Sequence, residues 1–115
     1  MNVLFTDYIT PEEYMDFRQA VGWSAFPIEQ AEQGLKNSYI FCLRKEGKAI
    51  ALGRVIWDHG YVVYIADVIV LPEYKGSGYG RKIMEKIMVE MKAMESRRAK
   101  EVRAILNAET ENTSN

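Results

Sequence analysis

Cysteine is almost absent from the sequence, with one residue, Cys42, in 115. A single cysteine excludes a disulfide framework within the chain and a cysteine-rich metal site, so we expect no bound metal. Cys42 lies in an apolar stretch, where we expect a small buried hydrophobic residue rather than a nucleophile. Histidine is equally scarce. His59 lies in a predicted turn, which favours a solvated side chain over a catalytic one.

Long hydrophobic runs and a strong charge of one sign are also missing. No run approaches the ~18 apolar residues that a membrane span needs, and the N-terminal residues lack the pattern of a secretory signal. We therefore expect no membrane partner and a location in the cytoplasm. The formal net charge is −1, which is too small to predict binding to nucleic acid.

The composition that remains is that of an ordinary soluble domain. The chain is 48% hydrophobic and 27% charged. Its length falls within the common size of one domain, roughly 100–150 residues. We therefore assign residues 1–115 to a single domain.

Alternating and helical patterns divide the first 70 residues into strands and helices. Residues 2–8 can form a short strand. Thr10, Pro11 and Glu13 then predict a helix start, since Thr10 can cap the helix and Glu13 can complete a capping box. Pro27 opens a second short helix. Three strands follow, separated by turns at 46–48 and 58–60, and they cover residues 38–44, 49–57 and 61–70.

The C-terminal third begins as an amphipathic helix, from residue 79 to about residue 95. Its apolar residues recur at helical spacing and are better explained by core packing than by a binding surface. They are Ile83, Met84, Ile87, Met88, Met91 and Met94. Residues 102–108 leave two alternatives. They can form a strand beside the one that ends at Val70, or the helix can continue through them, because residues 81–111 contain no proline or glycine.

Three alternate glycines, Gly76, Gly78 and Gly80, lie between the strand that ends at Val70 and this helix. Glycine has no side chain, so the backbone N–H groups of such a loop can approach a ligand closely. The helix adds its unsatisfied N-terminal N–H groups and the positive end of its dipole. A strand, a glycine loop and a helix in this order are suited to hold a phosphate or pyrophosphate.

A dinucleotide-binding fold is the less favoured explanation of this loop. Its fingerprint is Gly-x-Gly-x-x-Gly after the first strand of a βαβ unit. Here the spacing is Gly-x-Gly-x-Gly, and the loop follows a meander of strands. We therefore do not expect NAD to bind.

The order of elements and the loop together resemble the GNAT family of N-acetyltransferases. The family motif is a strand ending in Val-x-Pro, an aromatic residue, Arg or Gln, and Gly-x-Gly-x-Gly/Ala. Here it reads Val70-Leu71-Pro72, Tyr74, Lys75 and Gly76-Ser77-Gly78-Tyr79-Gly80. The departure is Lys75, which keeps a donor but gives a less defined geometry than Arg.

The resemblance implies an α/β (α+β) fold with a mixed, mainly antiparallel sheet flanked by helices. It favours the strand at residues 102–108. It also implies a C-terminally truncated domain that lacks the family's last helix and strands, because the sequence stops at Asn115.

For the loop, the resemblance implies acetyl-CoA as the co-substrate. The implied pyrophosphate contacts are Lys75, Gly76, Ser77, Gly78, Tyr79, Gly80 and Arg81. The pantetheine arm would pair with the backbone of Val68, Ile69 and Val70 as an added half-strand. An N–H near Ile69 or Val70 would stabilise the oxyanion that develops on the thioester. Asn112 is implied as a further coenzyme contact.

The implied reaction is direct attack of a primary amine of a small molecule on the thioester. It needs a base, and Asp67 is the best-placed carboxylate, since alternation puts it on one side of its strand with Ile65 and Ile69. An unpaired acid in so apolar a run suits a base, and the alternative is a carboxylate that is satisfied by Arg54 or a backbone donor. Both alternatives remain open. The tyrosine that commonly acts as the general acid, on a later helix, is absent from the sequence.

Family members usually contact the acceptor with the connection between the first two helices, which here contains Trp23 and Phe26. These aromatic residues form either a cleft wall over an apolar or aromatic amine, or a hydrophobic plug against the sheet. A second function is a non-catalytic acetyl-CoA-binding or dimer-forming module. It is motivated by the sheet edge that would stay open without the last strands. We therefore expect a homodimer.

Overall fold

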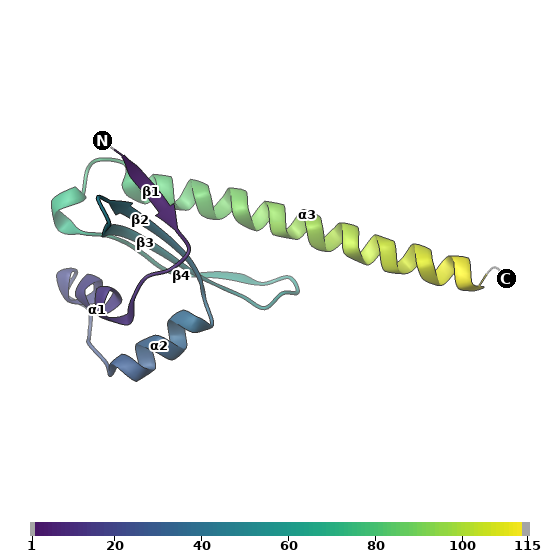
Figure 1. The fold of residues 1–115 in the computed structure, drawn as a ribbon, viewed down its shortest axis with the longest axis horizontal. Coiled ribbons are helices and arrows are strands. Elements are labelled where there is room, and N and C mark those ends of the chain that lie inside the picture. The colour runs from purple at the N-terminus through teal and green to yellow at the C-terminus, as the bar shows by residue number, and fades with distance from the viewer. Residues whose placement is uncertain (1, 114–115) are drawn as a thin grey trace.

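The computed structural model describes the backbone of residues 2–113 and the side chains of residues 2–95 and 97. One antiparallel sheet has the strand order β1-β2-β3-β4, and helices lie on both of its faces (Figure 1). The elements in chain order are β1 (Val3–Thr6), α1 (Pro11–Ala20), α2 (Ile28–Lys36), β2 (Tyr39–Lys45), β3 (Lys48–Trp57), β4 (Val63–Val70), the 3₁₀ turn η1 (Pro72–Tyr74) and α3 (Tyr79–Thr113). This confirms the predicted fold class and, to within a few residues, the predicted elements up to the start of α3; α3 itself runs well past its predicted end near residue 95.

Helix α1 begins with the predicted capping box. The Glu13 N–H donates to Thr10 Oγ1 at 3.1 Å, and the Thr10 N–H donates to Glu13 Oε1 at 3.0 Å. The helix is followed by Gly22, whose φ of +78° is one that side chains rarely adopt. Both ends of α1 are therefore set by residues within or next to the helix itself.

The sheet separates two hydrophobic cores. On one face α1 and α2 cover Ile40, Leu52 and Ile69, and on the other face α3 covers Leu43, Ile50 and Val55 (Figure 1). Helix α3 lies close to β3 because position 53 is glycine. A Cβ at Gly53 would come within 2.6 Å of Ile83 Cγ2 and 2.9 Å of Ile87 Cδ1. The turns of α3 that carry Ile83 and Ile87 are packed on the sheet in this way.

The Arg44 side chain, on β2, makes hydrogen bonds that connect β1, α1 and the β2–β3 turn. Its guanidinium donates to both carboxylate oxygens of Glu13, at 2.8 and 2.9 Å, and to the backbone oxygens of Tyr8 and Gly47. Its Nε donates to Thr6 Oγ1. The Arg44 side chain is 9% exposed, and that of Glu13 is 29% exposed. This bidentate ion pair lowers the pKa of Glu13 from 4.5 to about 2.

The Glu13–Arg44 pair predicts a pH dependence of stability. Because the folded-state pKa of Glu13 lies below its unfolded value, the contribution is complete above pH 4.5 and is lost as the pH falls toward 2. We expect Glu13→Gln to lower the free energy of unfolding by about 1 to 2 kcal/mol at pH 6, since partial exposure screens the pair. Urea unfolding of both proteins at pH 6 and pH 3 measures this. The difference between them should shrink at pH 3, and a difference that stays constant would contradict the assignment.

The predicted strand at residues 102–108 is wrong. These residues lie within α3, which runs without a break to Thr113. The stretch has no proline or glycine, and it is rich in residues with high helix propensity. A helix satisfies its backbone hydrogen bonds internally, whereas a strand would need the full length of a partner. Within residues 2–113, no strand follows β4.

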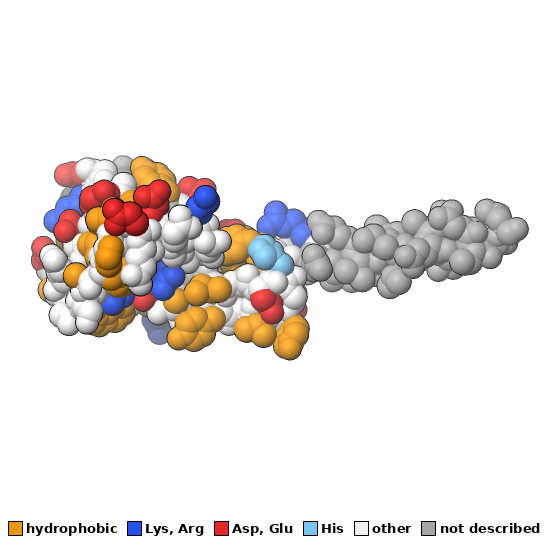
Figure 2. All heavy atoms as spheres, turned by 90° about the horizontal axis from the view of Figure 1, so that it is seen from below, with side chains coloured by type: hydrophobic (Ala, Val, Ile, Leu, Met, Phe, Trp, Pro, Cys, Tyr) orange, Lys and Arg blue, Asp and Glu red, His pale blue; other side chains and the backbone are white. Residues whose placement is uncertain are grey.

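The outer edge of β4 is open. Within the described residues, β4 pairs with β3 alone. Exposed hydrophobic side chains lie on the β3–β4 hairpin and along β4 (Figure 2), and they are Ile56, Tyr61, Val62, Val63, Tyr64 and Val68. The sequence led us to expect an open edge beyond a strand at residues 102–108, whereas in the structure the open edge is that of β4 itself.

Candidate active site

The glycine loop joins the C-terminal end of β4 to the N-terminal end of α3. After η1, Lys75 has an extended backbone, and Gly76 and Gly78 have φ of +86° and +81°. An L side chain is strained in this region, so glycine is required at both positions. A Cβ at either glycine would meet no atom within 4 Å, which shows that the space in front of the loop is open.

The N–H groups of residues 76–81 face no acceptor among the residues that the structure describes. The first backbone hydrogen bond of α3 is donated by Lys82 to the oxygen of Gly78, at 3.1 Å. Six consecutive donors are therefore available at the positive end of a helix dipole, beside the exposed side chains of Lys75, Ser77 and Arg81. This arrangement can bind a pyrophosphate.

Tyr79 contributes to the loop with its backbone, because its ring packs into the α3 core, edge-on to Tyr74 at 6.4 Å between centroids. Gly80 lies against the end of β4, where an added Cβ would be 3.7 Å from Val70 Cγ2. Lys45 and Lys48 each place their Nζ 5.8 Å from the centre of the Tyr74 ring. They add positive charge on the β2–β3 side of the loop.

The backbone of Val70 and Val68 points to the open edge of β4. The Leu71 N–H donates across to Ile50 O at 3.0 Å, so residues 71 and 69 face β3. In an antiparallel pair the hydrogen-bonding direction alternates along the strand. Of the two candidates for the oxyanion donor, the geometry therefore favours the N–H of Val70 over that of Ile69.

Asp67 is buried, with 6% of its side chain exposed, and it is paired. Arg54 Nε donates to Asp67 Oδ2 at 2.6 Å, and the Tyr14 hydroxyl donates to the same oxygen at 2.7 Å. The alternative in which Arg54 pairs with Asp67 is thus the one found. Burial and the hydrogen bond to Asp67 raise the pKa of Tyr14, so its hydroxyl remains protonated at neutral pH. We call these residues the Tyr14–Asp67–Arg54 cluster.

The second oxygen of Asp67 is accessible. No described residue donates to Oδ1, and among described residues no fully buried side-chain oxygen or nitrogen lacks a partner. Oδ1 must therefore reach solvent-accessible space. A carboxylate fixed through one oxygen and open at the other can accept a proton from a bound group.

The sequence placed Ile65 on the same side of β4 as Asp67 and Ile69, and this prediction is wrong. A β-bulge lies opposite the Arg54/Val55 step, so Arg54 pairs with Asp67 but Val55 pairs with Ile65. The extra residue, Ala66, reverses the alternation. Ile65 packs in the α3 core, whereas Asp67 and Ile69 face α1 and α2. The bulge therefore changes the face on which Ile65 lies and leaves Asp67 on the face of Ile69.

Trp23 and Phe26 lie around the guanidinium of Arg18, whose carbon is 5.4 and 4.7 Å from their ring centres. Arg18 Nε also donates to the oxygen of Ser24 at 2.7 Å, which fixes the α1–α2 connection. Phe26 is half-buried and lines a cavity of about 210 Å³, which we call the α1–α2 cavity. Trp23 is 41% exposed and does not line it.

Cys42, His59 and Asn112 lie outside this arrangement. Cys42 is fully buried, and burial raises the pKa of its thiol. His59 is in the β3–β4 turn, where its ring is tilted against that of Trp57, with 4.3 Å between the ring centroids. Asn112 is 33 residues along α3 from Tyr79, about 50 Å at the rise of a helix. Its side chain lies outside the described residues, and its place on α3 does not support the predicted coenzyme contact.

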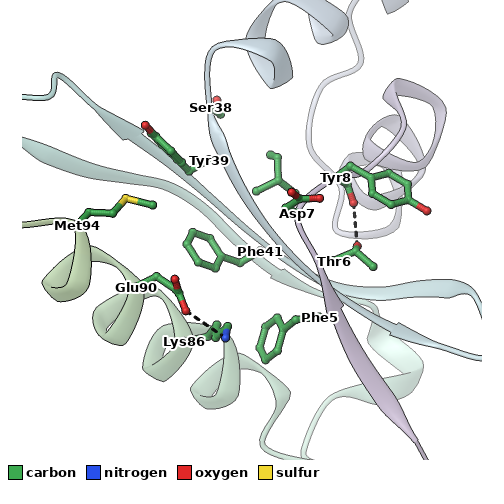
Figure 3. Close-up of a pocket in the computed structure, with 11 residues that line it drawn as sticks. Phe5, Thr6, Asp7, Tyr8, Ser38, Tyr39, Phe41, Lys86, Glu90 and Met94 are labelled. Carbon is green, nitrogen blue, oxygen red and sulfur yellow. Dashed lines mark hydrogen bonds and ion pairs between the residues drawn. The ribbon is translucent and has the colours of Figure 1, made fainter. Parts of the chain in front are cut away.

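A larger cavity, of about 770 Å³, opens between α3 and the ends of β1 and β2 (Figure 3). Phe5, Phe41 and Met94 line it, together with the ion pair of Lys86 and Glu90. It contains none of the predicted site residues. In the described part of the chain no cluster of metal-binding side chains occurs, and no helix there has the length and hydropathy of a membrane span.

Comparison with known proteins places these features in one family. The sequence model of the acetyltransferase (GNAT) family matches residues 5–114. The chain is 36% identical over 80 residues to a histone acetyltransferase of Glycine max, TAP1, covering 59% of this chain and 35% of that protein. It is 30% identical over 89 residues to the chloroplastic GCN5-related N-acetyltransferase 2 of Arabidopsis thaliana, covering 59% and 34%. The chain thus spans about a third of the length of these relatives.

A solved structure agrees with the sequence comparisons. A protein of Staphylococcus aureus, described as a probable acetyltransferase, superposes with a TM-score of 0.74 at 39% identity, covering 81% of this chain and 71% of that one. Similarity to one family of proteins therefore accounts for both the fold and the glycine loop.

Proposed function

The chain belongs to the GNAT family of acetyltransferases, and we propose that it transfers the acetyl group of acetyl-CoA to a primary amine of a small molecule. The observation that carries this proposal is the row of unpartnered N–H groups from Gly76 to Arg81 at the start of α3. These donors would hold the coenzyme's pyrophosphate, with Lys75 beside it.

The open edge of β4 would receive the rest of the coenzyme. The pantetheine arm contains amide groups, which can pair with the outward N–H and C=O groups of Val68 and Val70 as a short added strand. The Val70 N–H would then donate to the thioester oxygen as negative charge develops on it.

Direct attack needs a neutral amine. In the proposed reaction the amine nitrogen bonds to the thioester carbon, and the thiolate of coenzyme A leaves. Asp67 Oδ1 takes a proton from the amine, while Tyr14 and Arg54 hold the carboxylate through Oδ2. Helix α1, through Tyr14, and strand β3, through Arg54, would therefore position the base, which itself lies on β4.

A second candidate is a non-catalytic acetyl-CoA-binding module that forms a homodimer. The exposed hydrophobic side chains along β4 and its hairpin support it, because an open apolar edge favours pairing with another strand. If the chain is such a module, a second copy would cover the outer edge of β4, which pantetheine would occupy in the proposed transferase.

A titration with acetyl-CoA, followed by a thiol-release assay, tests both candidates. We expect acetyl-CoA to bind with a dissociation constant of roughly 1 μM to 1 mM and NAD not to bind under the same conditions. Coenzyme-dependent thiol release with members of a panel of primary amines supports the transferase. Binding without release supports the module, especially if light scattering shows a dimer. Binding of NAD but not acetyl-CoA would reject both.

A further inference from the structure

The α1–α2 cavity lies beside the candidate base. Arg54 and Tyr14, the two partners of Asp67, both line it. Phe26 and Leu35 form apolar walls. The volume of about 210 Å³ is smaller than that of a typical drug-sized site, so it suits a molecule of amino-acid size.

Arg54 lines this cavity, and part of its guanidinium has no hydrogen-bond partner among the described residues. Its Nε is bound to Asp67, and its Nη1 donates to Ser38 Oγ at 3.1 Å. No described residue accepts from Nη2. Because the described residues include no fully buried side-chain nitrogen without a partner, Nη2 reaches accessible space. Guanidinium N–H groups in this position are matched by the two oxygens of a carboxylate.

The charges around the cavity also favour an anionic group. Its lining contains Arg54 and no carboxylate. A second guanidinium, that of Arg18, lies behind the wall, 4.7 Å from the Phe26 ring centre and 3.5 Å from the Tyr14 hydroxyl. Asp67 offsets one of these two positive charges, so one remains.

Gly34 leaves the guanidinium open to the cavity. It lies within α2, where its φ is not in the left-handed region and glycine is less stable than alanine. A Cβ there would be 3.9 Å from Arg54 Nη1, at van der Waals contact, and would meet no other atom within 4 Å. Folding therefore does not require glycine at this position, whereas access to Arg54 benefits from it.

We propose that the acceptor amine carries a carboxylate, as an α-amino acid does, and that Arg54 binds this carboxylate in the α1–α2 cavity. The inference rests on the proposed transferase function and adds the substrate class. The amine of such a molecule lies within a few bonds of its carboxylate. It would therefore be held close to the Asp67 carboxylate, which Arg54 contacts.

Matched pairs of acceptors test the proposal on the unmodified chain. L-Phenylalanine and phenethylamine differ by the carboxylate, as do L-leucine and 3-methylbutylamine. Thiol release from acetyl-CoA is measured for each, and kcat/KM is compared per concentration of neutral amine. We expect the amino acid to be favoured by about 10- to 100-fold, the range of a charge-assisted hydrogen bond. Equal rates, or faster reaction of the decarboxylated amines, would overturn the proposal.

A variant checks the place of binding. Gly34→Ala should raise KM for the amino acids about 10-fold, leave the dissociation constant of acetyl-CoA unchanged and not lower the melting temperature. Gln33→Ala, on the exposed side of the same helix, is the matched control and should change neither constant. An unchanged KM in Gly34→Ala would overturn the assignment to this cavity.

Failure of this inference can be told apart from failure of the proposed function. If acetyl-CoA binds and amines react without a preference for the carboxylate, only the inference fails. If no amine releases thiol, calorimetric binding of L-phenylalanine against phenethylamine still decides. Tighter binding of the amino acid, reduced by about 10-fold in Gly34→Ala, supports the anion site, and equal binding overturns it.

Discussion

Replacing Arg54 with leucine is expected to lower the free energy of unfolding by about 3 kcal/mol at neutral pH. The Asp67 side chain is 6% exposed, and its Oδ2 accepts from Arg54 and Tyr14 alone among the described residues. Without Arg54 the carboxylate stays buried with one neutral hydrogen bond. Removing one partner of a buried ion pair is costly because the other charge is left without compensation.

Urea unfolding of three variants at pH 7 measures this effect. In Arg54→Leu combined with Asp67→Asn the uncompensated charge is gone, and Asn still accepts from Tyr14, so most of the loss should be recovered. Lys86→Ala is the control, since it breaks the Lys86–Glu90 pair, whose side chains are 40% and 37% exposed. It should change stability by less than about 0.5 kcal/mol. An Arg54→Leu variant as stable as Lys86→Ala would refute the burial argument.

The elements that local chemistry determines could be predicted from the sequence. The capping box at Thr10 and Glu13 involves residues three apart, and the structure forms both of its hydrogen bonds. The apolar stripe of α3 follows the helical period, and its members Ile83 and Ile87 are buried, whereas Met88, which the same pattern assigned to the core, is 55% exposed. The glycine loop was recognisable because its backbone needs glycine at positions 76 and 78.

The cluster at Asp67 depends on contacts that no local pattern encodes. Tyr14 is 53 residues from Asp67 and reads in the sequence as one more apolar position of α1. The bulge at Ala66 has no glycine or proline to mark it, so strict alternation put Ile65 on the wrong face. A polar residue within an apolar run was the available signal, and it identified Asp67 together with Arg54 as a possible partner.

The C-terminal prediction failed for a different reason. The family resemblance favoured a strand at residues 102–108, whereas local propensity left a helix equally open. The structure agrees with the helix propensity of these residues, since α3 continues to Thr113. Although the family model matches residues 5–114, membership in the family therefore does not determine the local structure of residues 102–108.

Gly78→Val is expected to weaken acetyl-CoA binding at least 100-fold, on the proposal that residues 76–81 hold its pyrophosphate. Gly78 has a φ of +81° with open space where a side chain would stand. A β-branched residue is strained at this φ, so the loop must leave the conformation in which its N–H groups have no partner within the protein. Its side chain would also occupy the space in which the phosphate approaches. Isothermal titration of both proteins with acetyl-CoA measures the change.

Gly22→Val separates this effect from a general loss of stability. Gly22 has a φ of +78° and equally open surroundings, but it lies at the end of α1 and outside the loop. Both variants should lose a similar free energy of unfolding, about 1 to 3 kcal/mol, because the same backbone strain is introduced. Gly22→Val should nevertheless bind acetyl-CoA as the unmodified chain does. Equal weakening in the two variants would mean that binding follows overall stability, and the loop would then no longer be the phosphate site.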